Sequence, residues 1–255
     1  AGNVATIRLS VKADGKAVTG LGSITLRVPV GKLLIPDTRT PLADGKTAAS
    51  VQVTQPSLIV RADGTLLPSA YVTGDTLVVT LTGDATLTLS ENAKGFSDVP
   101  ADHWAHTAVA FATARELFSG TGEHTFSPGS DMTRAMLMTV LARLDGQDVS
   151  GGATYYEKAM VWAQSAGISD GKNALPPITR EQLAAMLYRY AGSPAVNDAA
   201  LSFADAAQAS SYAGSALRWA ADEGLLTGKP GGLLDPKASA TRAEVSAILM
   251  RYLVQ

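Results

Sequence analysis

Three threonine-arginine pairs are the residues of this sequence best suited to hold an anion. Each opens a stretch of helical periodicity, and they stand at Thr133-Arg134, Thr179-Arg180 and Thr241-Arg242. Threonine is a natural N-cap, and an arginine fork at a helix N-terminus can hold a carboxylate through charge-assisted hydrogen bonds. The alternative is that the arginines cap helices or bridge neighbouring segments. Arg134, Arg180 and Arg242 are therefore candidate ligand contacts.

Aromatic residues and glycines recur at fixed distances around the same stretches. When Phe111, Trp162 and Trp219 are aligned, an aromatic residue stands seven positions earlier, at Trp104, Tyr155 and Tyr212. A glycine stands eight positions after the following alanine, at Gly120, Gly171 and Gly228. The first set can offer rings to the C–H faces of sugars. The glycines are expected to form left-handed caps after a helix and to let a sugar approach the main chain. The aligned Phe and Trp residues are predicted core.

A Phe-x-Asp start recurs in two of the three copies, as Phe96-Ser-Asp98 and Phe203-Ala-Asp205. Asp98 and Asp205 are candidate ligand contacts, or else cap a helix or a turn. The middle copy lacks this start and has a shorter loop. In the first copy Met136 replaces an acid, and Glu116 stands where the other copies have Gly167 and Gly224. Three equivalent binding sites are therefore not expected, and the middle copy is predicted to be more scaffold than site.

Other chemistry finds little support in the sequence. The His-x-x-His pair His103 and His106 lacks a third ligand at suitable spacing, and no carboxylate pair, nucleophile elbow or phosphate loop stands out. We predict no catalytic residues, no metal and no cofactor.

Composition narrows the class of partner. The 255 residues are 46% hydrophobic and 17% charged, with a net charge of −2 and no cysteine. No broad basic surface is available for nucleic acid or anionic lipid, and disulfides and thiol catalysis are excluded. There is no run of about 18 apolar residues, and the start lacks the regions of a signal peptide. The expectation is a mature chain or a fragment, with neither nucleic acid nor membrane as partner.

Residues 1–93 are predicted to form an all-β sandwich-like domain. Asp-Gly and Thr-Gly-Asp turns separate alternating Thr- and Val-rich runs, which is the pattern of antiparallel strands. Strands are expected at Ala5–Lys12, Ser23–Val30, Ser50–Thr54, Ser57–Arg61, Thr76–Thr82 and Ala85–Ser90, and a long loop at Lys32–Gly45.

Residues 94–255 change character to alanine-rich helical periodicity. Helices are predicted at Ala105–Leu117, Arg134–Leu144, Tyr155–Ala166, Arg180–Tyr190, Ser211–Glu223 and Arg242–Leu253. The recurring positions predict three repeats, at about 94–147, 150–193 and 200–255. Each helix pair exposes an apolar face, so the copies are expected to pack on one another.

The first and third copies resemble S-layer homology (SLH) modules. The resemblance rests on FSDVPADHWAHTAVAFATARELFSGTGEHTFSPGSDMTRA and SFADAAQASSYAGSALRWAADEGLLTGKPGGLLDPKASATRAE. It implies an all-α, pseudo-threefold bundle of three helix-loop-helix repeats, with ligand grooves between neighbours. The implied function is non-covalent attachment to an anionic, often pyruvylated, secondary cell-wall polysaccharide of a Gram-positive-type bacterium.

The overall expectation is thus α+β in separate domains, exported to the cell wall, non-enzymatic, and binding a polysaccharide or another peptidoglycan-linked glycan. Two alternatives remain open. The chain could be the anchor fragment of a larger surface enzyme such as a glycosidase, or a self-assembling S-layer subunit.

Overall fold

A computed structural model describes residues 3–10, 12–13, 16–17, 23–30, 55–197 and 201–254. The predicted loop at 32–45 and the predicted strand at 50–54 lie outside these residues. The chain divides into two compact units, one made of Ala1–Phe126 with Met250–Gln255 and the other of Ser127–Leu249. The change of sequence character near residue 93 falls inside the first unit.

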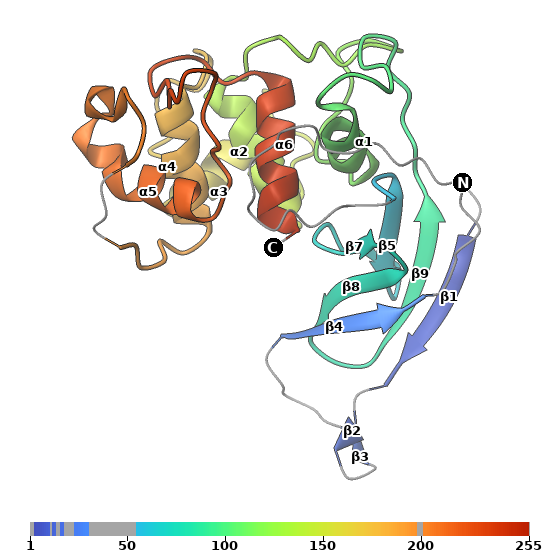
Figure 1. Cartoon of the computed structure of the whole chain (residues 1–255). Helices are drawn as coiled ribbons and strands as arrows, with labels where there is room; N and C mark the ends of the chain where they lie inside the picture. The colour runs from blue at the N-terminus through green and yellow to red at the C-terminus, as the bar shows by residue number, and fades with distance from the viewer. Residues whose placement is uncertain are drawn as a thin grey trace. The chain divides into compact units, whose positions relative to one another are not determined.

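The strands of the first unit form antiparallel sheets (Figure 1). One sheet has the order β1-β9-β5-β6, a second has the order β4-β8-β7, and β2 pairs with β3. The bounds are β1 Asn3–Leu9, β2 Lys12–Ala13, β3 Lys16–Ala17, β4 Ile24–Pro29, β5 Leu58–Ala62, β6 Thr65–Leu66, β7 Tyr71–Thr73, β8 Thr76–Leu81 and β9 Ala85–Glu91. The predicted strands that lie within the described residues are present, with bounds that differ by a few residues.

Strand alternation builds the core of this unit. The buried faces of β5, β7, β8 and β9 share one apolar cluster, and residues of β1 and β4 pack against it. The Asp-Gly turn between β5 and β6 has positive φ at both residues, 48° at Asp63 and 89° at Gly64. A two-residue hairpin requires these angles, which explains the residue types.

Helix α1 (His106–Ala114) belongs to the first unit, where it is tied to the strand region by the residue that follows it. Arg115 is 2% exposed, and its guanidinium donates to the backbone oxygens of Pro56, Leu58, Pro68 and Ala70, and of Phe111 in its own helix. The guanidinium carbon also lies 3.5 Å from the centroid of the Phe111 ring. Burial lowers the pKa of Arg115 to about 9, so the side chain remains a cation at neutral pH.

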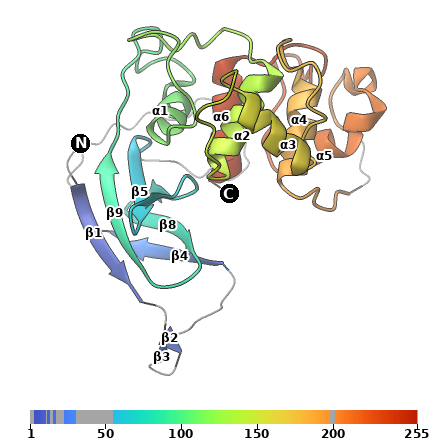
Figure 2. The same cartoon turned by 180° about the vertical axis from the view of Figure 1, so that it is seen from behind.

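The second unit holds α2, α3, α4, α5 and the start of α6, and contacts join α2 to α3 and α4 to α5 (Figure 2). The bounds are α2 Arg134–Leu144, α3 Glu157–Ser165, α4 Arg180–Tyr190, α5 Gly214–Asp222 and α6 Arg242–Leu253, with 3₁₀ turns η1 at Ala206–Gln208 and η2 at Ser211–Ala213. The bounds predicted for α2, α4 and α6 agree with the structure, because a threonine fixes where each begins.

The predicted fold class, an all-β domain followed by an all-α pseudo-threefold bundle, is wrong. The first helix packs within the β-containing unit, and the helical region also contains isolated β-bridges, among them Asp131 with Thr241, Thr133 with Pro177 and Thr179 with Ser239. The loops that precede α2, α4 and α6 are long, and their backbone polar groups need partners. Strand-like pairing between the loops supplies those partners, which the helical periodicity of the sequence does not reveal. The chain is a mixed α+β structure.

These three loops close into a ring of hydrogen bonds, which we call the three-loop ring. The N–H of Met132 donates to the oxygen of Ala240 over 2.9 Å, that of Ala240 to Ile178 over 2.9 Å, and that of Ile178 to Met132 over 2.7 Å. All three residues are fully buried. Within this ring each loop thus donates one hydrogen bond and accepts one, so the buried backbone groups of each loop depend on both of the other loops for partners.

The first helix of each pair ends in a left-handed residue. Glu116, Gly167 and Gly224 have φ values of 60°, 69° and 66°, and the next residue in each case bonds back to the last turn of the helix. The cap predicted at Gly120, Gly171 and Gly228 therefore lies four residues earlier. Glu116 adopts a backbone conformation that favours glycine, which accounts for the glycines at the two equivalent positions.

Candidate functional site

The N-termini of α2, α4 and α6 do not offer their backbone N–H groups to a ligand. The first two N–H groups of each helix donate to carbonyls of a neighbouring loop: Arg134 to Pro176 and Ala135 to Ala174; Arg180 to Ala238 and Glu181 to Pro236; Arg242 to Ser130 and Ala243 to Pro128. The third N–H of each helix donates to the hydroxyl of its own capping threonine. The predicted combination of helix N-terminus and arginine is therefore wrong in its first part. Any anion held here must be held by side chains.

Two of the three arginines are enclosed. Arg180 is 4% exposed, donating from Nε to the oxygen of Leu234 over 2.9 Å and from Nη1 to Glu244 over 3.3 Å. Arg242 is 7% exposed. Both positions suit the bridging role that was the alternative interpretation of the sequence.

Arg134 lies closer to the surface, with 16% of its side chain exposed. Its Nη2 donates to Ser169 Oγ over 2.9 Å and to Asp170 Oδ1 over 2.8 Å. Its Nε is buried and has no hydrogen-bond partner in the part of the chain that the structure describes. Asp170 itself is 61% exposed, so an external carboxylate could take its place on the guanidinium.

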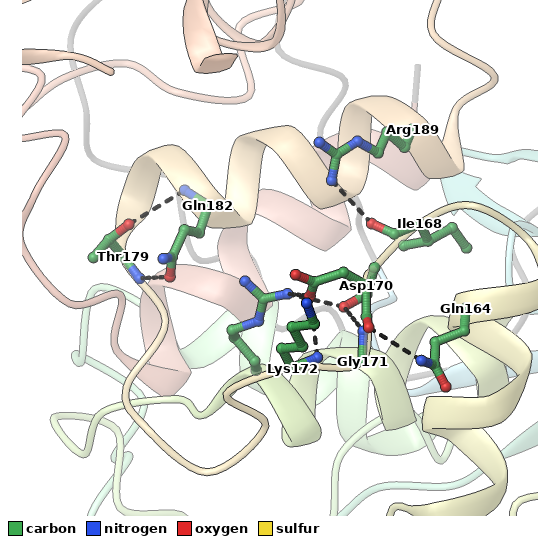
Figure 3. A network of polar contacts seen from close by, with 10 residues as sticks. Gln164, Ile168, Asp170, Gly171, Lys172, Thr179, Gln182 and Arg189 are labelled. Atoms are coloured by element: carbon green, nitrogen blue, oxygen red, sulfur yellow. Dashed lines mark hydrogen bonds and ion pairs between the residues drawn. The ribbon is translucent and has the colours of Figure 1, made fainter. Parts of the chain in front are cut away.

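The loop after α3 carries Asp170, Gly171 and Lys172 (Figure 3). The Asp170 carboxylate accepts the hydrogen bond from Arg134. The same carboxylate oxygen accepts the N–H of Lys172 over 3.1 Å, and the Asp170 carbonyl accepts from Gln164 Nε2 over 3.1 Å. Gly171 N donates to Ser169 Oγ over 3.2 Å, so the loop is held on both sides of the aspartate. We call Arg134, Ser169, Asp170 and Lys172 the Arg134 cluster.

A second polar cluster surrounds Glu181, whose side chain is only 5% exposed. Its carboxylate accepts from the N–H and the hydroxyl of Ser210, both over 2.9 Å, from the Tyr212 hydroxyl over 3.1 Å and from Lys237 Nζ over 2.7 Å. Burial raises the pKa of Glu181, but these donors outweigh burial and hold the pKa below its ordinary value. We call these four residues the Glu181 cluster.

Tyr212 links the two clusters electrostatically. Burial and the Glu181 anion together raise the pKa of its hydroxyl to about 12, against the opposing effect of the positive charges of Arg134 and Arg189. Arg189 donates from Nη1 to the oxygen of Ile168 over 3.3 Å, next to Ser169. Arginines 134 and 189, Asp170 and the Glu181 cluster therefore share one region of the second unit.

The three predicted sugar-contacting rings are all exposed. Trp104, Tyr155 and Tyr212 are 58%, 55% and 53% accessible. Trp104 stacks on His103 with ring centroids 5.8 Å apart, and Tyr155 meets Tyr156 edge-on at 5.1 Å. By contrast Phe111 and Trp219 are buried, as predicted, and Trp162 is half-buried.

Asp98 and Asp205 hold loops. Both carboxylate oxygens of Asp98 accept the N–H of Phe126, at 2.9 and 3.2 Å, and those of Asp205 accept the N–H groups of Leu234 and Asp235, at 2.7 and 2.8 Å. Phe126 and Leu234 are equivalent positions in the two copies. The Phe-x-Asp start therefore fastens the beginning of each copy to its long loop.

The glycines at 120, 171 and 228 are positions of close approach. A Cβ on Gly120 would come within 2.9 Å of the Phe96 ring, and one on Gly228 within 2.7 Å of the Phe203 ring. In the middle copy, which lacks this phenylalanine, the side chain of Gln164 fills the same place against Gly171.

Sequence reasoning missed Ser169, Asp170, Glu181, Ser210 and Lys237. The signal available was the alignment of the copies, which places Glu181 where the other Thr-Arg pairs are followed by Ala135 and Ala243. The same alignment pairs Ser169 and Asp170 with Phe118 and Ser119 in the first copy and with Leu226 and Thr227 in the third, so only the middle copy has a carboxylate there.

The imidazole rings of the His-x-x-His pair are both bonded to backbone. Nδ1 of His103 accepts the N–H of Ala105, and Nδ1 of His106 bonds the oxygen of Val99. Within the described residues no group of three or more His, Cys, Asp or Glu is placed to hold a metal. No described helix has the length and apolar character needed to cross a membrane.

Two segments, residues 95–135 and 202–246, match the S-layer homology domain family. An amylopullulanase from Thermoanaerobacterium thermosulfurigenes is 32% identical over 180 residues, covering 62% of this chain and 9% of that protein. The exoglucanase XynX from Acetivibrio thermocellus is 30% identical over 172 residues, covering 60% and 16%. An S-layer protein from Bacillus thuringiensis subsp. finitimus is 24% identical over 180 residues, covering 62% and 21%.

These similarities place the chain among proteins of the cell wall or cell surface. More particularly, its residues 95–135 and 202–246 match the S-layer homology domain, a module of cell-surface anchoring. The chain spans only 9% to 21% of the length of the three relatives named above.

Proposed function

We propose that this chain anchors an exported protein by binding an anionic secondary polysaccharide of a Gram-positive-type cell wall, with a ketal-linked pyruvate as the charged group. The observation that carries the proposal is the contact between Arg134 and the exposed Asp170. A carboxylate already sits on this guanidinium, and a pyruvate carboxylate has the same donor requirements.

The sugar itself would pack on exposed rings. Tyr155 and Tyr212 belong to the same unit as Arg134, and Trp104 offers a similar ring in the first unit. Sugar C–H faces pack on such rings, while the carboxylate supplies charge and orientation. Asp98, Asp205, Arg180, Arg242 and the three glycines support the scaffold in this proposal, and residues 150–193 act as a third, diverged module.

A pull-down on purified wall sacculi tests the proposal. The chain should sediment with untreated sacculi and remain in solution after hydrofluoric acid has stripped the polysaccharide. Retention on stripped sacculi would instead place the ligand in the peptidoglycan.

Arg134→Ala should weaken wall binding about tenfold or more, since a charge-assisted hydrogen bond contributes roughly 1.5–3 kcal/mol. Arg143→Ala is the matched control, because it removes the same charge from the last turn of the same helix, about 14 Å away along the axis. Equal binding by the two variants, with melting curves like that of the wild type, would remove Arg134 from the site.

A second candidate concerns the whole protein. The amylopullulanase and the exoglucanase match this chain over a small part of their own length, which supports the proposal that the chain is the anchor of a larger surface glycosidase. The alternative is a self-assembling S-layer subunit, which the similarity to an S-layer protein supports. The coding sequence on either side of this chain would distinguish the surface glycosidase from the S-layer subunit. A catalytic domain in the flanking sequence would establish the enzyme.

A further inference from the structure

Glu181 is an acid at a position where the equivalent helices carry alanine. It is the second residue of α4, and the second residues of α2 and α6 are Ala135 and Ala243. A carboxylate that is 95% buried is expensive unless donors surround it. The donors around Glu181 are therefore the feature to explain.

All the donors to the Glu181 carboxylate come from one later part of the chain. Ser210 donates twice, through its N–H and its hydroxyl, while Tyr212 donates its hydroxyl and Lys237 its ammonium group. The ammonium group of Lys237 also contacts the Ser210 hydroxyl. No residue of α4 itself is among these donors. Residues 210–237 thus present a carboxylate-binding set, and α4 supplies the carboxylate.

We propose that Ser210, Tyr212 and Lys237 form a carboxylate-binding site and that Glu181 is its built-in occupant. The inference deepens the proposed function, on which it rests for the identity of the natural ligand. At the equivalent positions the middle copy has Ala153, Tyr155 and Leu175, so the serine and the lysine have no counterparts there. A cluster able to take an acidic sugar is thus closed by an acid of the chain, which leaves the Arg134 cluster as the place for an anionic ligand.

Removing the occupant tests this directly, with sodium pyruvate as the probe. In Glu181→Ala, pyruvate should raise the melting temperature above the value in sodium chloride of equal ionic strength, because it binds the vacated site of the folded state only. The apparent affinity taken from this shift should be about tenfold or more greater than for the wild type. Adding Lys237→Met to Glu181→Ala should return the pyruvate-specific shift to the wild-type value, because the Arg134 cluster is intact in both proteins.

An identical response of wild type and Glu181→Ala to pyruvate would overturn the inference, as would a gain over the wild-type shift that survives Lys237→Met. If Glu181→Ala does not fold in chloride, refolding is attempted in pyruvate. Recovery in pyruvate alone supports a vacated site, and failure in both salts counts against one. No wall material is used, so a failure here is distinguishable from a failure of the wall pull-down.

Discussion

Asp205 uses both of its carboxylate oxygens to hold the backbone of a single loop. The hydrogen bond from the N–H of Leu234, and then the one from Asp235, favour the charged form of the carboxylate. The pKa of Asp205 therefore lies below its ordinary value. A group with a lowered folded-state pKa contributes stability above its unfolded pKa of about 3.9. That contribution is lost as pH falls through the folded-state pKa.

Acidification should therefore destabilise the wild type more than Asp205→Asn. Between about pH 5 and pH 2 the wild type should lose more of its melting temperature, because only the wild type must protonate this carboxylate. Thermal melts across the range measure both slopes, and Asp131→Asn, an exposed acid of the same unit, controls for net charge. Parallel slopes for wild type and Asp205→Asn would show that the loop bonds do not depend on the charge.

For single residues, the sequence predicted which positions matter better than it predicted their hydrogen-bond partners. Asp98 and Asp205 were recognised because Phe-x-Asp recurs, but the oxygens they offer go to N–H groups 28 to 30 residues away. A local pattern gives no access to such partners. Arg134 was recognised for the same reason, while its partners Ser169 and Asp170 lie at positions where the other two copies have different residues.

Helices α2, α4 and α6 differ in how completely their first turn is capped. Thr179 with Gln182, and Thr241 with Glu244, form reciprocal pairs in which each side chain accepts the other's backbone N–H. In α2 the third residue is Met136, so the Thr133 hydroxyl accepts the N–H of Met136, but the methionine side chain offers no oxygen to accept the N–H of Thr133. The methionine at position 136, noted in the sequence, thus leaves α2 with only half of the capping box.

Gln182→Met should destabilise the second unit by about 0.5–1 kcal/mol, because it removes half of a capping box, and Met136→Gln should stabilise it by a similar amount. Urea denaturation followed by circular dichroism measures both. Met136→Leu controls for the change in packing at position 136. The capping explanation fails if Met136→Leu and Met136→Gln stabilise equally.

The starts of α2, α4 and α6 could be read from the sequence because a threonine fixes each one. The carbonyls that cover their first N–H groups could not, since Pro128, Ala174 and Pro236 belong to a different copy in each case. Which loop meets which helix is a property of how the copies pack. That packing is absent from any single copy, and it also decided that the region is not purely helical.

For the whole molecule, the buried Arg115 determines where the first helix belongs. Four of its five acceptors are backbone oxygens between Pro56 and Ala70, so α1 and the strand region form one unit although their sequences differ in character. The sequence did not predict this, because an arginine at the end of an alanine-rich helix resembles a solvated terminus.

Arg115→Met should destabilise the first unit by about 3 kcal/mol or more, because it leaves several buried carbonyls without donors. Chemical denaturation measures the loss, and Arg115→Lys, which keeps the charge but not the five-donor fork, should fall between methionine and wild type. Arg218→Met is a control in the second unit. A loss below about 1 kcal/mol would show that Arg115 merely fills space.

The three-loop ring has a mechanical consequence for an anchor. A force that draws one loop away from the other two must break the bond it donates and the bond it accepts together, since Met132, Ile178 and Ala240 each do both. Hydrogen bonds that are loaded in parallel share the applied force, whereas hydrogen bonds that are loaded in series break one at a time. In a surface protein anchored through this region, the pulling force would have to break two buried backbone hydrogen bonds at once before any one of these loops could separate.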